Sequence, residues 1–134
     1  MRPAARVLHD AQDLRDANAR LGREISEAHP DGVLLVAVLK GSLIFLSDLV
    51  RRISVPVEID FLGISSYAPN SGRVRLTKDL STDLTDRTVI LVEDVVDTGL
   101  TLAYLLAQLR SRGPASLEVC TLFDKRARRI MPQP

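Results

Sequence analysis

The sequence has few of the residues that mark disulfide-bonded, metal-cysteine or membrane proteins. Its 134 residues include one cysteine, no tryptophan, two tyrosines and three phenylalanines. A single cysteine, Cys120, excludes an internal disulfide and a cysteine-rich zinc site, and it favours a reducing, cytoplasmic compartment. The longest uninterrupted apolar run, Val33–Leu39, is far shorter than the roughly 20 residues of a membrane helix. The polar stretch from Met1 to Gln12 does not have the pattern of a signal peptide.

Neither sign of charge dominates the chain. The 18 Lys and Arg residues nearly balance the 17 Asp and Glu residues, for a formal net charge of +1. This balance gives no global electrostatic reason to expect binding to nucleic acid or to a membrane surface. The hydrophobic share of 46% is enough to build a core, and the length fits one domain over residues 1–134. Two common nucleotide-binding motifs, Gly-x-x-x-x-Gly-Lys-Ser/Thr and Gly-x-Gly-x-x-Gly after a strand, do not occur.

Segments with helix and strand patterns alternate along the chain. Apolar residues three or four apart predict a helix over Asp10–Ala28, in which Asp10 and Asp13 cap the amino end. The valine-rich segments Val33–Leu39 and Thr88–Val92 have the composition of strands buried on both faces. Further helices are expected over Ser42–Ile53, with Ser42 as N-cap, and from Gly99 to Gly113; further strands are expected over Val55–Phe61, Arg73–Thr77 and Leu117–Phe123.

This alternation predicts an α/β fold with a mostly parallel sheet. In the strand Val55–Phe61, apolar residues alternate with Glu58 and Asp60, so that strand is expected to be half exposed. Ligands of such folds bind beyond the carboxyl ends of the strands. The loops at that edge of the sheet are Lys40–Ser42, Glu93–Thr101 and Asp124–Arg126.

The segment from Val89 to Leu102 carries the strongest chemical signal. A buried strand ends in two adjacent carboxylates, Glu93 and Asp94, and the chain reaches a third, Asp97, before turning through Thr98-Gly99 into a helix. Backbone amides and threonine hydroxyls at a helix amino end suit a phosphate group. Carboxylates beside a phosphate repel it unless a sugar diol or a Mg²⁺ ion lies between them. The residues therefore predict a phosphorylated sugar with a metal; the alternative is a solvated loop in which Asp97 or Thr98 only caps the helix.

The same segment resembles the phosphoribosyl pyrophosphate signature of type I phosphoribosyltransferases, and Glu93-Asp-Val-Val-Asp97 resembles the version in their hypoxanthine-guanine branch. Three further motifs follow the order of that branch. Val36–Ser42 is similar to its pyrophosphate loop. Asp60–Tyr67 with Lys78–Leu80 is similar to its mobile catalytic loop and the returning strand, and Leu122–Arg126 is similar to the segment with its purine-reading lysine. The resemblance covers nearly the whole chain and implies the fold of this family, a central mostly parallel sheet flanked by helices with an incomplete hood.

The resemblance implies transfer of a 5-phosphoribosyl group from phosphoribosyl pyrophosphate to a 6-oxopurine, with Mg²⁺ as cofactor. Asp97 is implied as the general base and Lys125 as the purine-binding residue, because an ammonium group donates to a 6-oxo group and offers nothing to a 6-amino group. Lys40 and Gly41 are implied at the pyrophosphate, Ser66 and Tyr67 in the mobile loop, and Glu93 and Asp94 at the metal. The implied phosphoribosyl-binding set is Glu93, Asp94, Asp97, Thr98, Gly99, Leu100 and Thr101.

The sequence also departs from the family pattern. Leu100 stands where several members have lysine, and the chain ends at Pro134, where members continue into strands that stack on and read the base. The alternatives are therefore an inactive truncated form, or a non-catalytic regulator on the same fold that senses nucleotide. Lys40 and Lys125 also fit ordinary solvated positions at strand ends. The resemblance predicts a homodimer or homotetramer, with no membrane association and no nucleic-acid partner.

Overall fold

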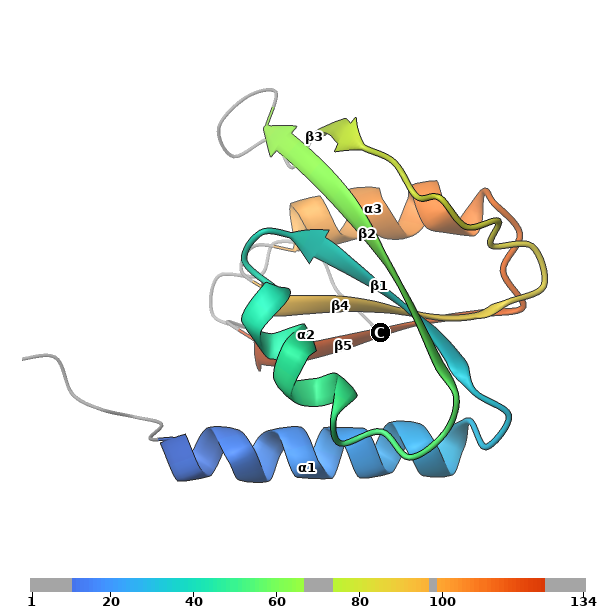
Figure 1. Ribbon diagram of the computed structural model, residues 1–134. Helices are drawn as coiled ribbons and strands as arrows, with labels where there is room; N and C mark the ends of the chain where they lie inside the picture. The colour runs from blue at the N-terminus through green and yellow to red at the C-terminus, as the bar shows by residue number, and fades with distance from the viewer. Residues whose placement is uncertain (1–10, 67–73, 97–98, 125–134) are drawn as a thin grey trace, which may run out of the picture.

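A computed structural model describes residues 11–66, 74–96 and 99–124 (Figure 1). Three helices and five strands follow one another in the order α1, β1, α2, β2, β3, β4, α3, β5. The helices are α1 (Ala11–Ala28), α2 (Leu43–Val50) and α3 (Leu100–Arg110). The strands are β1 (Val33–Leu39), β2 (Val57–Ser66), β3 (Val74–Lys78), β4 (Thr88–Val96) and β5 (Ser116–Asp124).

The five strands form one sheet in the order β3-β2-β1-β4-β5. The β1–β2, β1–β4 and β4–β5 pairs are parallel, and the β2–β3 pair is antiparallel. The parallel strands β1 and β4 are neighbours although α2, β2 and β3 lie between them in sequence. Their carboxyl ends therefore meet at one edge of the sheet, where loops of distant sequence converge. The predicted α/β fold with a mostly parallel sheet is confirmed.

Helices cover both faces of the sheet (Figure 1). Helix α3 packs against one face through Leu102, Leu105, Leu106 and Leu109. Helices α1 and α2 cover the other face with Ile25, Phe45, Leu46 and Leu49. Alternate residues of β1 and β4 enter the two clusters, so these central strands are buried on both sides, as their unbroken apolar composition predicted.

Helix α1 packs on the sheet through the apolar stripe that its spacing predicted, with Ile25 buried and Leu21 packed against the same core cluster, and a glycine and an asparagine are buried beside it. Its buried residues are Asn18, Gly22 and Ile25. A Cβ atom at Gly22 would lie 2.4 Å from the carbonyl oxygen of Arg52, so this glycine lets the helix approach the segment after α2. The missing side chain of Gly22 thus allows close contact between the two backbones beside the apolar stripe. Asp13 lies in the first turn, and Asp10 lies outside the described residues.

Strand β2 corrects a second expectation. It runs through Ser66, beyond the predicted end at Phe61, and its Ile59 is 42% exposed whereas Asp60 is only 6% exposed. The Asp60 carboxylate faces the segment that links β3 to β4 and accepts the backbone N–H groups of Ser81 (2.8 Å) and Thr82 (2.9 Å). The alternation of apolar and acidic residues predicted that the acidic side chains face solvent. The backbone N–H groups of Ser81 and Thr82 have no partner in the sheet, however, and the buried Asp60 carboxylate accepts their hydrogen bonds.

Helix α2 ends at Val50, three residues before the predicted end, and a turn follows at Arg51 and Arg52. Within the described ranges no helix is both long enough and apolar enough to cross a membrane.

Candidate active site

The acidic pair lies inside the end of β4 rather than in a loop after it. The strand continues through Glu93 and Asp94 to Val96, because β5 pairs with it as far as Asp124. Side chains of a strand alternate between its faces. Since Val89 and Leu91 pack toward α3 and Ile90 and Val92 toward α1 and α2, Glu93 belongs to the α3 face and Asp94 to the α2 face.

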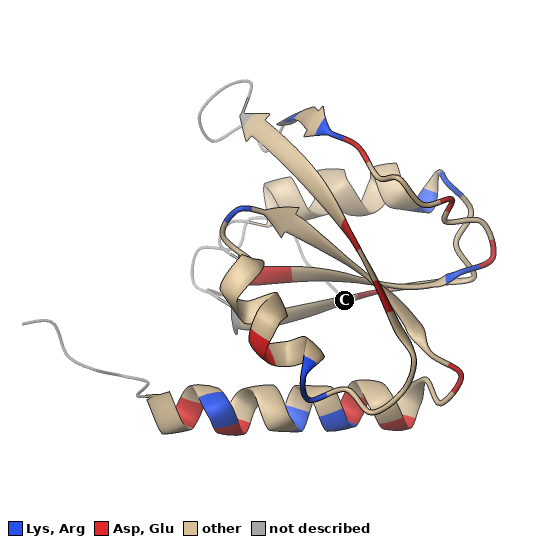
Figure 2. Cartoon of the chain, in the orientation of Figure 1, with Lys and Arg blue, Asp and Glu red and all other residues tan. Residues whose placement is uncertain are grey.

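The loop between β1 and α2 lies directly against Asp94. A Cβ atom added at Gly41 would be 3.4 Å from Asp94 Oδ2 and 3.5 Å from Oδ1, so any larger side chain at position 41 would touch this carboxylate. The peptide bond between Leu39 and Lys40 is cis, and Lys40 is exposed. Figure 2 shows the acidic segment of β4 beside the start of α2. The fold therefore brings together two of the three loops that the sequence indicated.

Ser42 anchors this loop in a way that the sequence did not reveal. It occupies the N-cap position of α2 but makes no capping hydrogen bond to the helix. Its side chain is fully buried, and its hydroxyl donates instead to the carbonyl of Val38 at the end of β1. The predicted N-cap position is confirmed, although the Ser42 hydroxyl does not cap the helix. The hydrogen bond to Val38 connects the start of α2 to the end of β1 and so holds Lys40 and Gly41 at the edge of the sheet. No pattern in the sequence indicates such a bond between a serine and a carbonyl four residues before it.

The electrostatics at the end of β4 are unusual for a pair of carboxylates. Burial, reinforced by the adjacent charge of Asp94, raises the pKa of Glu93 from 4.5 to about 7. Within the part of the chain that the structure describes, neither carboxylate receives a hydrogen bond or an ion pair. Two partly buried carboxylates without cations are costly, and a ligand that supplies positive charge or hydroxyl donors removes that cost.

Helix α3 begins on the same edge of the sheet. Its N-cap, Gly99, has a φ of 87°, a left-handed conformation that glycine adopts without steric cost. Leu100 and Thr101 lie in the first turn, and the helix begins four residues after the end of β4 at Val96. The positive end of the helix dipole therefore lies near the acidic pair, as the phosphate-binding interpretation requires.

Several predicted site residues fall outside the described part of the chain. These are Tyr67, Asp97, Thr98 and Lys125. Ser66 is described as the last residue of β2, where its backbone pairs with Val74.

The donor set at the end of β4 fits a magnesium ion that also binds substrate. Both side chains are oxygen ligands, which Mg²⁺ prefers, and the described residues contain no cluster of three or more His, Cys, Asp or Glu side chains able to hold a metal. A protein-only metal cage is thus missing from the described ranges. Mg²⁺ commonly uses one or two carboxylates and completes its octahedron with substrate oxygens and water.

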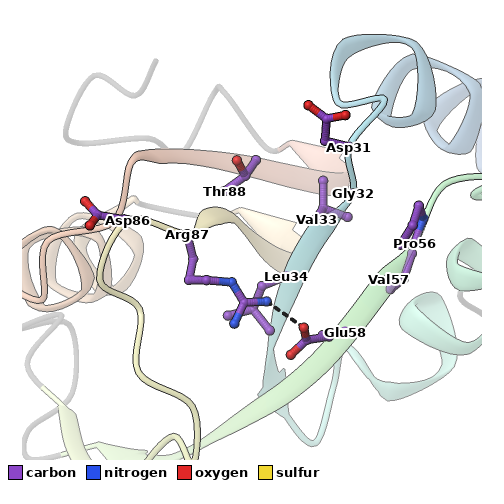
Figure 3. Close-up of a pocket in the computed structure, with 10 residues that line it drawn as sticks. All are labelled: Asp31, Gly32, Val33, Leu34, Pro56, Val57, Glu58, Asp86, Arg87 and Thr88. Carbon is purple, nitrogen blue, oxygen red and sulfur yellow. Dashed lines mark ion pairs between the residues drawn. The ribbon is translucent and has the colours of Figure 1, made fainter.

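The opposite edge of the sheet has a pocket of different character. It has a volume of about 290 Å³ and is lined by residues at the amino ends of β1, β2 and β4. There the carboxylate of Glu58 pairs with the guanidinium of Arg87 at 2.9 Å (Figure 3). Glu58 is thus paired with a cation of the protein. The other two acidic residues of the lining, Asp31 and Asp86, are exposed to water, whereas Glu93 at the end of β4 is withdrawn from it.

Comparison with known proteins identifies the family. Residues 5–133 match the phosphoribosyl transferase domain family. The chain belongs to this family. It is 46% identical over 129 residues to the hypoxanthine-guanine phosphoribosyltransferase of Mycobacterium avium, which covers 89% of this chain and 64% of the relative. It is 42% identical to the hypoxanthine phosphoribosyltransferase of Haemophilus influenzae, with 96% of this chain and 75% of the relative covered.

Solved structures of such enzymes share the fold. A hypoxanthine-guanine phosphoribosyltransferase from Bacillus anthracis superimposes with a TM-score of 0.93 at 35% identity, covering 99% of this chain and 81% of that one. A mutant hypoxanthine phosphoribosyltransferase from Trypanosoma cruzi, complexed with the product IMP, gives a TM-score of 0.92 at 34% identity, covering 98% and 73%. The chain spans slightly less than two thirds of the length of its mycobacterial relatives.

Proposed function

We propose that this chain is the phosphoribosyl-transferring part of a purine salvage enzyme. The reaction takes phosphoribosyl pyrophosphate and a 6-oxopurine, hypoxanthine or guanine, and gives IMP or GMP with pyrophosphate. The observation that carries the proposal is the acidic pair at the end of β4, which has no hydrogen-bond or ion-pair partner among the described residues and whose Asp94 lies against Gly41. The family membership and the names of the relatives support the same chemistry.

The proposed reaction breaks the bond from ribose C1 to the pyrophosphate oxygen and forms a bond from C1 to an imidazole nitrogen of the purine. Positive charge develops on the ribose as pyrophosphate leaves, so catalysis depends on positioning and on electrostatic stabilisation. In this proposal Glu93 and Asp94 accept hydrogen bonds from the ribose diol. Thr98 to Thr101 hold the 5-phosphate at the start of α3, while Lys40 and the backbone of Gly41 face the pyrophosphate.

The remaining roles rest on the motif resemblance alone, and all their residues except Ser66 lie outside the described ranges. Asp97 accepts the proton that the purine nitrogen loses. Lys125 donates to the 6-oxo group and so selects against adenine. Ser66 and Tyr67 belong to the loop that excludes water from the reacting centre.

Glu93 and Asp94 are the residues that would hold Mg²⁺. When bound, the ion would neutralise the charge that develops on the pyrophosphate leaving group. The raised pKa of Glu93 supports this role, because a carboxylate that resists ionisation alone is stabilised by a nearby cation.

The test is a pyrophosphate-release assay with Mg²⁺, phosphoribosyl pyrophosphate and a panel of hypoxanthine, guanine, xanthine, adenine and uracil. We expect release with hypoxanthine or guanine and none with adenine or uracil. Release with uracil alone would overturn the purine assignment. Binding of phosphoribosyl pyrophosphate without release for any base would favour the regulator or the inactive form.

Asp97→Asn separates binding from chemistry within the same assay. The amide keeps the size of the side chain but accepts no proton, so we expect retained binding of phosphoribosyl pyrophosphate and a large loss of turnover. Unchanged turnover would remove Asp97 from the role of base. Assembly into a homodimer or homotetramer and a cytoplasmic location also stay predictions; sedimentation velocity tests the first and cell fractionation the second.

A further inference from the structure

A groove between α1 and α2 lies apart from the proposed active site. It has a volume of about 360 Å³ and shares no lining residue with the acidic edge of the sheet. From α1 it is lined by Leu14, Arg15 and Asn18, and from the end of α2 and the following turn by Asp48, Arg51 and Arg52. This volume lies in the range of small-molecule sites in proteins, about 300–1,000 Å³.

The groove carries an excess of positive charge. Three of its residues are arginines and one is an aspartate, and Figure 2 shows the basic residues of α1 and of the turn after α2 on facing elements. Arg15 donates to Gln12 Oε1 at 2.9 Å, and within the described ranges none of the three guanidinium groups forms an ion pair. Guanidinium groups without carboxylate partners are the preferred ligands of phosphate oxygens.

A buried amide in the wall of the groove lacks one of its partners. Asn18 is only 4% exposed, and its Nδ2 donates to the carbonyl of Leu14 at 2.9 Å. Its Oδ1 is buried and has no hydrogen-bond donor within reach. A buried acceptor without a donor costs roughly 1–3 kcal/mol. Asn18 therefore reports on the packing of the groove wall, where a bound ligand changes its surroundings.

The walls of the groove are held together by contacts beneath it. The turn at Arg52 packs on Gly22 so closely that a Cβ atom there would lie 2.4 Å from the Arg52 carbonyl oxygen. The backbone N–H of Ser54 donates to Ser26 Oγ at 3.0 Å. These two contacts fix the backbone of the segment after α2 on α1. Binding therefore needs to order only the arginine side chains.

We propose that this groove binds a small organic phosphate that also carries hydroxyl or amino donors. The guanidinium groups of Arg15, Arg51 and Arg52 hold the phosphate, and the exposed Asp48 carboxylate accepts from the donors. The ligand site is a second one, independent of the reaction at the end of β4.

The probe is AMP, a phosphate ester with hydroxyl and amino donors whose base is not a 6-oxopurine, and the readout is the side-chain amide resonance of Asn18 in ¹⁵N–¹H spectra of the full chain. We expect AMP to shift this resonance with saturation. In Arg15→Ser/Arg51→Ser, which loses two charged donors, we expect roughly tenfold or greater weakening of the dissociation constant measured from the shift. The matched control is Arg20→Ser/Arg23→Ser, which removes the same charge from exposed positions of α1 that do not line the groove.

The proposal fails if millimolar AMP leaves the Asn18 resonance in place. It also fails if the control pair weakens binding as much as the groove pair, because net charge then explains the effect. If a single-stranded RNA oligonucleotide depends on Arg15 and Arg51 while AMP does not bind, the groove is a nucleic-acid surface and the small-molecule site is wrong. Unchanged peaks elsewhere in the spectra of both variants verify that each is folded.

Discussion

Asp60 on β2 and Glu93 on β4 are both carboxylates withdrawn from solvent on the same sheet, but the protein treats them in opposite ways. Burial tends to raise the pKa of Asp60, yet hydrogen bonds from Phe61, Thr82 and Ser81 outweigh it and hold that pKa below 3.8. Burial raises the pKa of Glu93 to about 7, because no such donors compensate among the described residues and Asp94 adds a like charge. The first carboxylate is satisfied by the fold, and the second is left for a ligand.

The difference follows from where the two strands lead. Asp60 faces a link between strands whose amides have no sheet partner, so its carboxylate completes the backbone hydrogen bonding. Glu93 lies at the carboxyl end of a central parallel strand, where the fold provides a helix amino end and a loop at Gly41 but no cation among the described residues. A partnerless carboxylate in such a place indicates function, because it weakens the free protein.

The largest expected effect comes from removing a charge at the end of β4. We predict that Asp94→Asn lowers kcat/KM by roughly 100-fold or more, since under the proposed function it removes a ligand of the metal and of the ribose diol. The matched change on β2, Asp60→Asn, keeps the same shape and is expected to leave kcat/KM within a few-fold when both proteins are assayed well below their melting temperatures. Equal losses in the two variants would remove the functional distinction between them.

The second effect concerns stability. Asp60→Ala leaves the backbone N–H groups of Ser81 and Thr82 without their acceptor, so we predict a loss of about 2–3 kcal/mol in the free energy of unfolding, measured with urea. Asp83 is the control, because it accepts the backbone N–H of Thr85 at 3.0 Å but is exposed. Asp83→Ala is expected to cost clearly less, because water can replace the lost acceptor at this exposed position. A loss for Asp60→Ala no greater than for Asp83→Ala would show that burial does not matter.

The third effect is a pH dependence with opposite sign at the two sites. Between the ordinary pKa of 4.5 and the folded value of about 7, the folded state binds more protons at Glu93 than the unfolded state does. Stability of the ligand-free protein therefore falls as pH rises through this window. Asp60, with its lowered pKa, contributes stability above pH 3.8 that is lost as pH falls through its folded value.

Glu93→Gln isolates the first of these contributions. We predict that the variant loses the decline between pH 4.5 and pH 7 and is more stable than the wild type at pH 8, as measured by thermal unfolding without Mg²⁺. A wild type and variant with parallel stability profiles across this range would contradict the raised pKa.

The smallest effect is expected at the opposite edge of the sheet. Arg87 pairs with Glu58 at 2.9 Å, but the Glu58 side chain is 64% exposed, so water screens the pair. Glu58→Gln is predicted to change the unfolding free energy by less than about 1 kcal/mol. A change as large as that of Asp60→Ala would show that pairing at the surface matters as much as satisfaction inside.

The sequence predicted the central features because they depend on local composition. The unbroken apolar segments of β1 and β4 are stable only when both faces of each strand are buried. The Glu93–Thr101 segment contains the acidic residues and the turn into α3 in one short stretch of sequence. The sequence did not predict the burial of Asp60, the hydrogen bond from Ser42 to Val38, or the burial of Asn18 and Gly22. In each case the partner is distant in sequence or is a backbone group. The position of Asp94 against Gly41 likewise depends on the parallel pairing of β1 with β4, which no local pattern records.

A carboxyl-carbon NMR titration of Glu93, with and without phosphoribosyl pyrophosphate and Mg²⁺, tests the central claim most directly. We predict a pKa of about 7 in the free protein and a fall to 4.5 or below when ligand and metal are bound, because the charge of Mg²⁺ and the hydroxyl donors of the ribose stabilise the ionised carboxylate. A pKa that stays near 7 with saturating ligand would contradict the assignment of this carboxylate to the phosphoribosyl site.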